Sequence, residues 1–268
     1  VAAGMVPVAI GSQTAASITR PASYCGVYGM KPSYGVIPRT GVLKTTDTLD
    51  TIGFFTRHME DMERVFNALR LHGSNYPMIH QRLENPSLQQ LESGGKWKVA
   101  LVRTHLWDQA AEHVRGSILD WVNRAVRAEI GVEFVEADLP PEMEECHAIH
   151  ETIYNRCLAY YFQEEFKNHA DISPVTAELL AKGQAVTVQE YQAAIEAQTQ
   201  IKAVMEEFMG RFDALITVCT NDSAPERDAQ EGDDPGLMWT LAHLPVVSVP
   251  AFRSPDCLPV GLQLVGGR

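Results

Sequence analysis

The sequence has little that would direct the protein to nucleic acid, to a membrane or to an oxidising compartment. Lys and Arg number 22 against 34 Asp and Glu, giving a net charge of −12. This charge argues against nucleic acid or an anionic membrane surface as the principal partner, although a local basic groove stays compatible with it. No uninterrupted apolar run approaches the length of a membrane span. The five cysteines are odd in number and widely scattered, so no disulfide framework is indicated. We therefore predict a cytoplasmic protein without a membrane partner.

The sequence also lacks internal repeats, low-complexity segments and a linker that would divide two domains. No Gly-x-Gly-x-x-Gly turn follows the apolar run that ends at Val102, so no dinucleotide site is indicated, and we expect no cofactor. At 268 residues with 45% hydrophobic content, the chain can form one large core. We predict a single domain over residues 1–268.

Hydrophobic periodicity predicts an α/β fold. Apolar runs indicate strands at residues 6–10, 27–31, 97–102, 132–135, 212–217, 246–250 and 259–265. Apolar spacing and composition indicate helices at residues 56–71, 109–130 and 141–166, and capping residues at Ser173 and Thr187 indicate helices at 174–183 and 187–208. The strand–helix–strand unit at 97–135 predicts a parallel pair with a right-handed crossover. The consecutive helices predict a helical insertion at about 140–209, and the polar stretch 73–95 predicts a long surface connection.

The stretch from Gly11 to Pro21 follows the first predicted strand and contains a candidate nucleophile, Ser17. Residues 13–17 are small or polar and have no helix or strand period, so the backbone N–H groups of Thr14, Ala15, Ala16 and Ser17 lack an obvious ladder partner. Acyl transfer needs a nucleophile beside donors placed where an oxyanion forms. A Ser/Thr-rich loop whose hydroxyls only cap turns is the alternative.

The predicted helix at 141–166 contains Cys146, His147, His150 and Glu151. Cys146 and His150 lie one turn apart, as do His147 and Glu151, so a metal site can be imagined. The order matches neither His-Glu-x-x-His nor its inverse. We therefore predict no metal, and interpret this segment as a solvated helix face with one buried cysteine.

Residues 11–35 closely resemble the core motif of the amidase signature family, and weaker resemblance continues at residues 49–53, 238–245 and 258–266. The resemblance implies a mixed central β-sheet flanked by helices and members that hydrolyse or transfer amide groups. It implies Ser17 as the nucleophile. Members usually have Gly-Gly where this chain has Ala15-Ala16, so an oxyanion hole needing a positive φ there would be distorted.

The family triad is Ser–Ser–Lys. The resemblance places its bridging serine just upstream of Val1 and its lysine further upstream, and the family pattern continues past Gly266. We therefore expect a fragment with little activity of its own. Lys31 matches a family lysine distinct from the catalytic one and is expected to be structural. Arg20 is expected to brace the loop. His243 stands where many members have glycine, and we interpret it as a variant and not as a base.

The predicted function is amide hydrolysis through an acyl-enzyme on Ser17, with the amides of residues 14–17 forming the oxyanion hole. The predicted partner is a small-molecule amide, and a homodimer stays open. The carboxylates in the loop 219–236 are expected to border the acyl pocket, where they could recognise a cationic substrate. Two alternatives are the amidase subunit of a glutamine-dependent tRNA amidotransferase, which would bring tRNA and a second protein of the complex, and a non-catalytic amidase-like binding protein.

Overall fold

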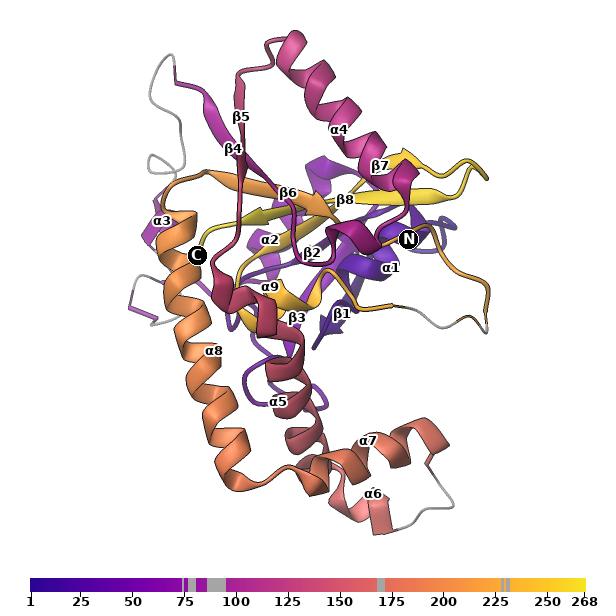
Figure 1. Cartoon of the computed structure of the whole chain (residues 1–268), viewed down its shortest axis with the longest axis vertical. Helices are drawn as coiled ribbons and strands as arrows, with labels where there is room; N and C mark the ends of the chain where they lie inside the picture. Colours follow the sequence, from indigo (N-terminus) through magenta and orange to yellow (C-terminus); the bar gives the residue numbers. More distant parts are fainter. Residues whose placement is uncertain (74, 77–80, 86–94, 168–171, 228, 230–231) are drawn as a thin grey trace.

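A mixed β-sheet forms the centre of the molecule (Figure 1). The computed structural model describes residues 1–268 except 74, 77–80, 86–94, 168–171, 228 and 230–231. Within the described residues the sheet has eight strands, in the order β1 (Val8–Gln13), β3 (Thr51–Thr56), β2 (Tyr28–Lys31), β7 (Val246–Arg253), β8 (Pro259–Gly266), β6 (Ala214–Val218), β4 (Trp97–Val102) and β5 (Val132–Ala137). Strand β4 pairs in parallel with β5 and β6, and the other pairs are antiparallel. The predicted α/β fold with a mixed sheet and the parallel pairing of 97–102 with the strand at 132 are confirmed.

The last four residues of β4, Val99 to Val102, are apolar and buried because helices cover both sides of the sheet. Val99 and Leu101 belong to the core under α4 (Glu112–Arg127), which contributes Val114 and Ile118. The alternate residues Ala100 and Val102 belong to the opposite core, formed with α5 (Cys146–Tyr161), α8 (Val188–Met209) and α9 (Leu237–Leu241). A smaller core lies between α2 (Met59–Leu69) and the β2–β3 pair.

The chain between β5 and β6 is helical, comprising η3 (Pro141–Glu145), α5, α6 (Gln163–Lys167), α7 (Pro174–Ala185) and α8. In Figure 1, α5 and α8 extend away from the sheet, and α6 and α7 lie at their far end. Helices α5 and α7 approach closely at Gly183, where an added Cβ would lie 1.9 Å from the Asn155 carbonyl oxygen. The parts of α5 and α8 nearer the sheet supply Ile153, Ile201 and Met205 to its core.

The structure differs from the sequence predictions chiefly around the first strand. Strand β1 begins at Val8, two residues after the predicted start, and continues to Gln13 instead of ending at Ile10. A helix that periodicity did not predict, α1 (Thr19–Cys25), follows directly. The predicted helix at 141–166 is divided into η3, α5 and α6. Of the predicted connection at 73–95, the structure describes the short helix α3 (Gln81–Glu84), while 74, 77–80 and 86–94 lie outside the described residues.

Two further findings concern the helices and the cysteines. None of the described helices is both long enough and apolar enough to cross a membrane. All five cysteines carry free thiols: Cys25 and Cys257 are exposed, and Cys146, Cys157 and Cys219 are buried.

Candidate active site

Ser17 lies in the short loop that joins the end of β1 to the start of α1. Its side chain is exposed, while Ala16 and Ile18 on either side are buried. Among the described residues, no side chain hydrogen-bonds to the Ser17 hydroxyl. The hydroxyl is therefore presented to solvent, without an activating base in the described part of the chain.

Gln13, the last residue of β1, fixes the shape of this loop. Its side chain is fully buried. The Gln13 Oε1 atom accepts hydrogen bonds from the backbone N–H groups of Ile18 at 2.9 Å and Thr19 at 3.0 Å. The Gln13 Nε2 atom donates to Thr240 Oγ1 at 2.9 Å, and Thr240 Oγ1 in turn donates to the Ala15 carbonyl at 2.6 Å. One amide side chain thus connects the two ends of the loop to α9. Sequence reasoning missed both Gln13 and Thr240.

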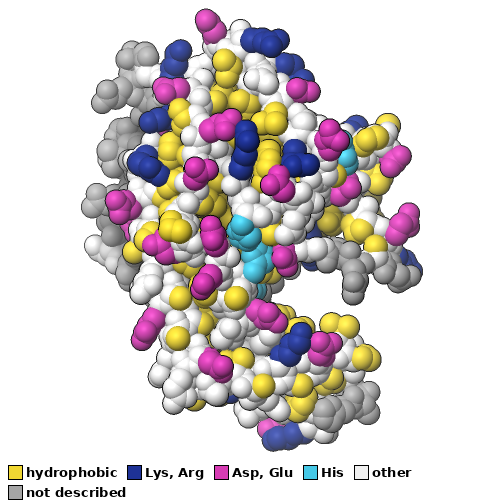
Figure 2. Space-filling model, viewed as in Figure 1, with side chains coloured by type: hydrophobic (Ala, Val, Ile, Leu, Met, Phe, Trp, Pro, Cys, Tyr) yellow, Lys and Arg dark blue, Asp and Glu magenta, His cyan; other side chains and the backbone are white. Residues whose placement is uncertain are grey.

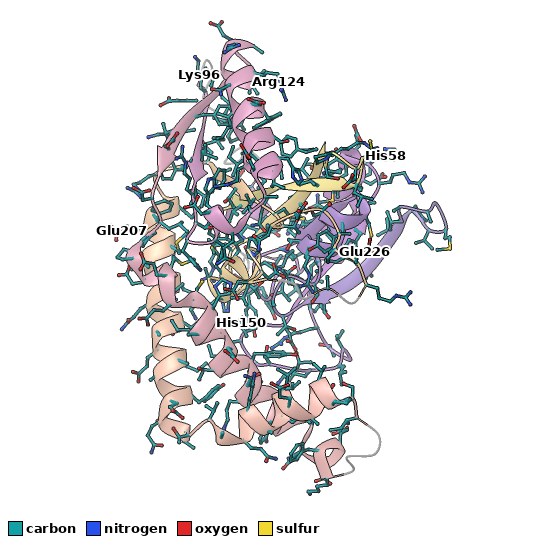
Figure 3. All side chains as sticks on the ribbon, turned by 45° about the vertical axis from the view of Figure 1, so that its right-hand side comes forward. His58, Lys96, Arg124, His150, Glu207 and Glu226 are labelled. Carbon is teal, nitrogen blue, oxygen red and sulfur yellow. The ribbon has the colours of Figure 1, made fainter. Side chains whose placement is uncertain are left out.

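His150 on α5 holds the loop from the opposite side. Its Nε2 atom lies 2.8 Å from the Thr14 carbonyl oxygen, so Nε2 carries the proton and donates. The side chain is buried and its ring stacks on Tyr154. Burial lowers the pKa of His150 to about 4, so the ring is neutral near pH 7. The prediction of a solvated face is wrong for His150, which Figure 3 places where α5 meets the strands and loops of the body. Cys146 is buried as predicted.

Asp50 accepts hydrogen bonds from several groups on the other flank of the loop. Its carboxylate accepts from Thr14 Oγ1 at 2.9 Å and from the backbone N–H groups of Thr45 at 2.8 Å and Thr46 at 3.1 Å. Burial raises the pKa of Asp50, but these hydrogen bonds outweigh it and hold the pKa below its usual value. The carboxylate is therefore ionised and fixes the Thr14 side chain.

The four predicted oxyanion donors are the backbone N–H groups of residues 14–17. No described residue accepts a hydrogen bond from any of them. Ala15 and Ala16 are not among the residues with positive φ, so alanine is unstrained at both positions. Space for the Ala16 methyl group depends on Gly236, where an added Cβ would lie 2.7 Å from the Ala16 Cβ. The geometry leaves these amides available, and their role stays a prediction.

Arg20 and Lys31 occupy different settings. Arg20 Nη1 pairs with Asp234 Oδ2 at 3.3 Å, and Asp234 Oδ1 accepts from the Gly236 N–H at 3.0 Å. Arg20 therefore connects α1 to the loop before α9. Lys31 is fully buried and donates to the carbonyls of Pro32 and Leu244. Burial lowers the pKa of Lys31 to about 7.

His243 is held by contacts on its face and its edge. The residue adopts φ 63°, the left-handed region that favours glycine. Its ring stacks on Tyr34 at a centroid distance of 4.3 Å, and Nε2 donates to the Thr48 carbonyl at 2.6 Å. Burial lowers the pKa of His243 to about 3. These contacts fit the interpretation of His243 as a structural variant.

The acidic loop lines a pocket beside Arg20. Asp222 and Asp233 contribute to its wall, together with Tyr24 and Thr220. Ser17 is not among the lining residues. The carboxylates therefore lie close to α1, but the structure does not bring them together with Ser17 in this pocket.

The family model named Amidase matches residues 1–268, and the chain belongs to the amidase family. The chain is 28% identical to the A subunit of the glutamyl-tRNA(Gln) amidotransferase of Halalkalibacterium halodurans, over 99% of this chain and 61% of that protein. Among solved structures, one described as an amidase has a TM-score of 0.81 at 22% identity and covers 97% of this chain and 58% of its own. The 6-aminohexanoate cyclic dimer hydrolase has a TM-score of 0.82 at 21% identity, covering 99% of this chain and 62% of its own. The chain thus spans about 61% of the length of the curated relative.

Proposed function

We propose that this chain carries the nucleophile and the oxyanion-binding loop of an enzyme that hydrolyses amides. The Ser17 oxygen attacks the amide carbon, the amine leaves with a proton, and water then hydrolyses the acyl-serine. The backbone N–H groups of residues 14–17 stabilise the oxyanion of the tetrahedral intermediates.

One observation carries this proposal: an exposed serine hydroxyl follows a run of backbone N–H groups without acceptors among the described residues, in a loop fixed from three sides. Gln13, His150 and Asp50 hold the loop through its neighbouring amides, a carbonyl and the Thr14 side chain. Such fixed donors reduce the reorganisation needed when charge develops on a substrate oxygen.

Full activity requires a base, and the described residues place none on Ser17. The family resemblance assigns that role to a bridging serine and a lysine that match no position in this sequence. In the serine-hydrolase template, an enzyme without its base keeps an advantage of roughly 10³–10⁴ over water. We therefore expect weak turnover from the 268-residue chain and much faster turnover from any longer gene product that supplies the base.

The experiment is labelling with a fluorophosphonate probe, followed by mass spectrometry of the labelled peptide, on both the 268-residue chain and the longest gene product that contains it. We expect weak labelling of Ser17 in the 268-residue chain, stronger labelling in a form that supplies the base, and loss of labelling and amide turnover in Ser17→Ala. The exposed Ser12 on β1 provides a matched control, because Ser12→Ala should leave both signals unchanged. In the more reactive of the two forms, a Ser17→Ala variant that is labelled as strongly as its parent would refute the proposal.

A second candidate function is that of the amidase component of a tRNA-dependent amidotransferase. The name of the Halalkalibacterium halodurans relative favours it. In that case the same Ser17 acyl-enzyme would form from glutamine, and the ammonia released would pass to a second protein of the complex. Copurification with such a protein and ammonia release stimulated by charged tRNA would support this function, whereas tRNA-independent hydrolysis of small amides favours the amidase.

We also propose a cytoplasmic location and a small-molecule amide as substrate. Five free thiols fit a reducing compartment. A homodimer is a further proposal, which size-exclusion chromatography with light scattering tests directly.

A further inference from the structure

Three side chains with metal-binding atoms meet outside the Ser17 loop: His105, Cys146 and His147. His105 follows β4, and the other two lie at the start of α5. Their Nε2, Sγ and Nδ1 atoms are the ones that approach one another. We propose that this cluster, the HCH cluster, binds one Zn²⁺ ion. The proposal is independent of the function of Ser17.

Two of the three separations between the ligand atoms are close to those of a tetrahedral zinc site. With Zn–N bonds of about 2.05 Å and a Zn–S bond of about 2.3 Å, tetrahedral ligands lie about 3.3 Å apart for N–N and about 3.6 Å apart for N–S. In the HCH cluster, His105 Nε2 lies 3.2 Å from His147 Nδ1, and Cys146 Sγ lies 3.4 Å from the same nitrogen. All three atoms lie within 4.8 Å of one another. His147 is therefore already placed against both partners, and the exposed His105 side chain would have to move toward Cys146 to complete the site.

The hydrogen bonding of His147 prepares its inner nitrogen as a ligand. His147 Nε2 lies 3.2 Å from the backbone carbonyl oxygen of Asp234, which can only accept. Nε2 therefore carries the proton, and Nδ1 presents its lone pair to the cluster. A carbonyl behind a ligating imidazole is the usual outer partner of a metal-bound histidine.

Access and charge also suit a cation. Cys146 is buried, His147 is half-buried and His105 is exposed, so an ion can enter from the His105 side. Figure 2 shows histidine side chains reaching the surface in the middle of this face, with acidic side chains around them. The exposed carboxylate of Asp233 acts electrostatically on both His105 and Cys146. We assign the fourth ligand position to water.

The donor set selects the type of ion. One thiolate and two imidazoles suit Zn²⁺, whereas Mg²⁺ and Ca²⁺ prefer oxygen ligands. Binding forms a Zn–S bond and releases the thiol proton of Cys146 to solvent, so affinity rises with pH.

The position of the HCH cluster gives the ion a structural effect. It would join the segment after β4, the start of α5 and, through the Asp234 carbonyl, the loop that carries the Arg20 partner. One turn further along α5, His150 holds the Ser17 loop. A bound ion would therefore stabilise the folded chain around this side of the loop.

The test is a titration of the metal-free chain with Zn²⁺ in competition with a chromophoric chelator, and a parallel titration with Co²⁺. We expect one Zn²⁺ per chain, and a thiolate-to-cobalt charge-transfer band that Cys146→Ser removes. Loss of a ligand in His105→Ala or His147→Ala should weaken Zn²⁺ binding by about 100-fold or more. If Cys146→Ser does not fold, His105→Ala still tests the proposal. His105 is exposed, so its replacement should leave the fold intact.

Matched controls are His58→Ala and Cys25→Ser, since neither residue belongs to the HCH cluster and Cys25 is exposed. Both should bind Zn²⁺ as the parent chain does. Less than one equivalent of Zn²⁺, equal affinity in His105→Ala and the parent, or a cobalt band that persists in Cys146→Ser would overturn the proposal. In that case the HCH cluster is a hydrogen-bonded pair, His105 and His147, beside the Cys146 thiol, without a metal-binding role.

Discussion

The Ser17 loop and the start of α8 are both held by polar side chains, but over very different distances along the chain. At the start of α8, Thr187 Oγ1 accepts from the Glu190 N–H, and the Glu190 carboxylate accepts from the Thr187 N–H. These partners lie three residues apart. In the Ser17 loop, Gln13 accepts from N–H groups five and six residues away but also donates to Thr240, 227 residues away, and His150 is 136 residues from Thr14.

The difference concerns burial as well as distance. The capping box is exposed, so water can replace either hydrogen bond when a side chain is removed. The partners of Gln13 are buried, and an N–H group left there without an acceptor keeps its full desolvation cost. The exposed caps should therefore contribute modestly to stability, and the buried contacts of the Ser17 loop much more.

The sharpest test of this contrast is Gln13→Leu. The variant removes the acceptor of two buried N–H groups and the donor to Thr240, so we expect a loss of about 3–5 kcal/mol in the free energy of unfolding. Urea denaturation measures the loss. The control Gln192→Leu replaces an exposed glutamine on α8 and should change stability by less than about 0.5 kcal/mol. Equal losses of stability in Gln13→Leu and Gln192→Leu would show that the buried contacts of Gln13 contribute no more than an exposed side chain does.

A second test uses pH. The pKa of His150 is lowered to about 4, so the unfolded chain binds a proton near pH 6.5 that the folded chain takes up only near pH 4. The stabilising contribution is complete above about pH 6.5 and is lost as the pH falls through about 4, by about 3 kcal/mol. His150→Gln keeps a donor for the Thr14 carbonyl without titrating. Urea denaturation at pH 7 and pH 4 should show that the free energy of unfolding falls less in the variant than in the parent. Equal decreases in the two proteins would contradict the lowered pKa of His150.

The smallest effect is expected at the cap. Thr187→Ala removes the acceptor for the Glu190 N–H and should lower the free energy of unfolding by about 1 kcal/mol. Ser173→Ala at the start of α7 removes an equivalent hydrogen bond to the Thr176 N–H and should behave alike. If Thr187→Ala costs as much as Gln13→Leu, burial of the contacts does not distinguish the two regions.

The same contrast explains which features could be predicted from the sequence. Hydrophobic period and caps act over a few residues, so β4, α7 and α8 were predicted within two residues at each end. The site could be predicted only as far as Ser17 and the amides beside it. The roles of Gln13, Thr240 and His150 depend on segments that the fold brings together, and no local pattern in the chain encodes their pairing. Helix α1 was missed because Thr19–Cys25 is short and contains a proline.

His243 has a consequence for how substitutions in related chains are interpreted. A histidine that replaces glycine invites assignment as a new proton-transfer group. Here the imidazole is occupied by Tyr34 and the Thr48 carbonyl, and these contacts offset the unfavourable backbone angle. Exchange between glycine and histidine at such a place alters how one turn is stabilised and leaves the repertoire of reactions unchanged.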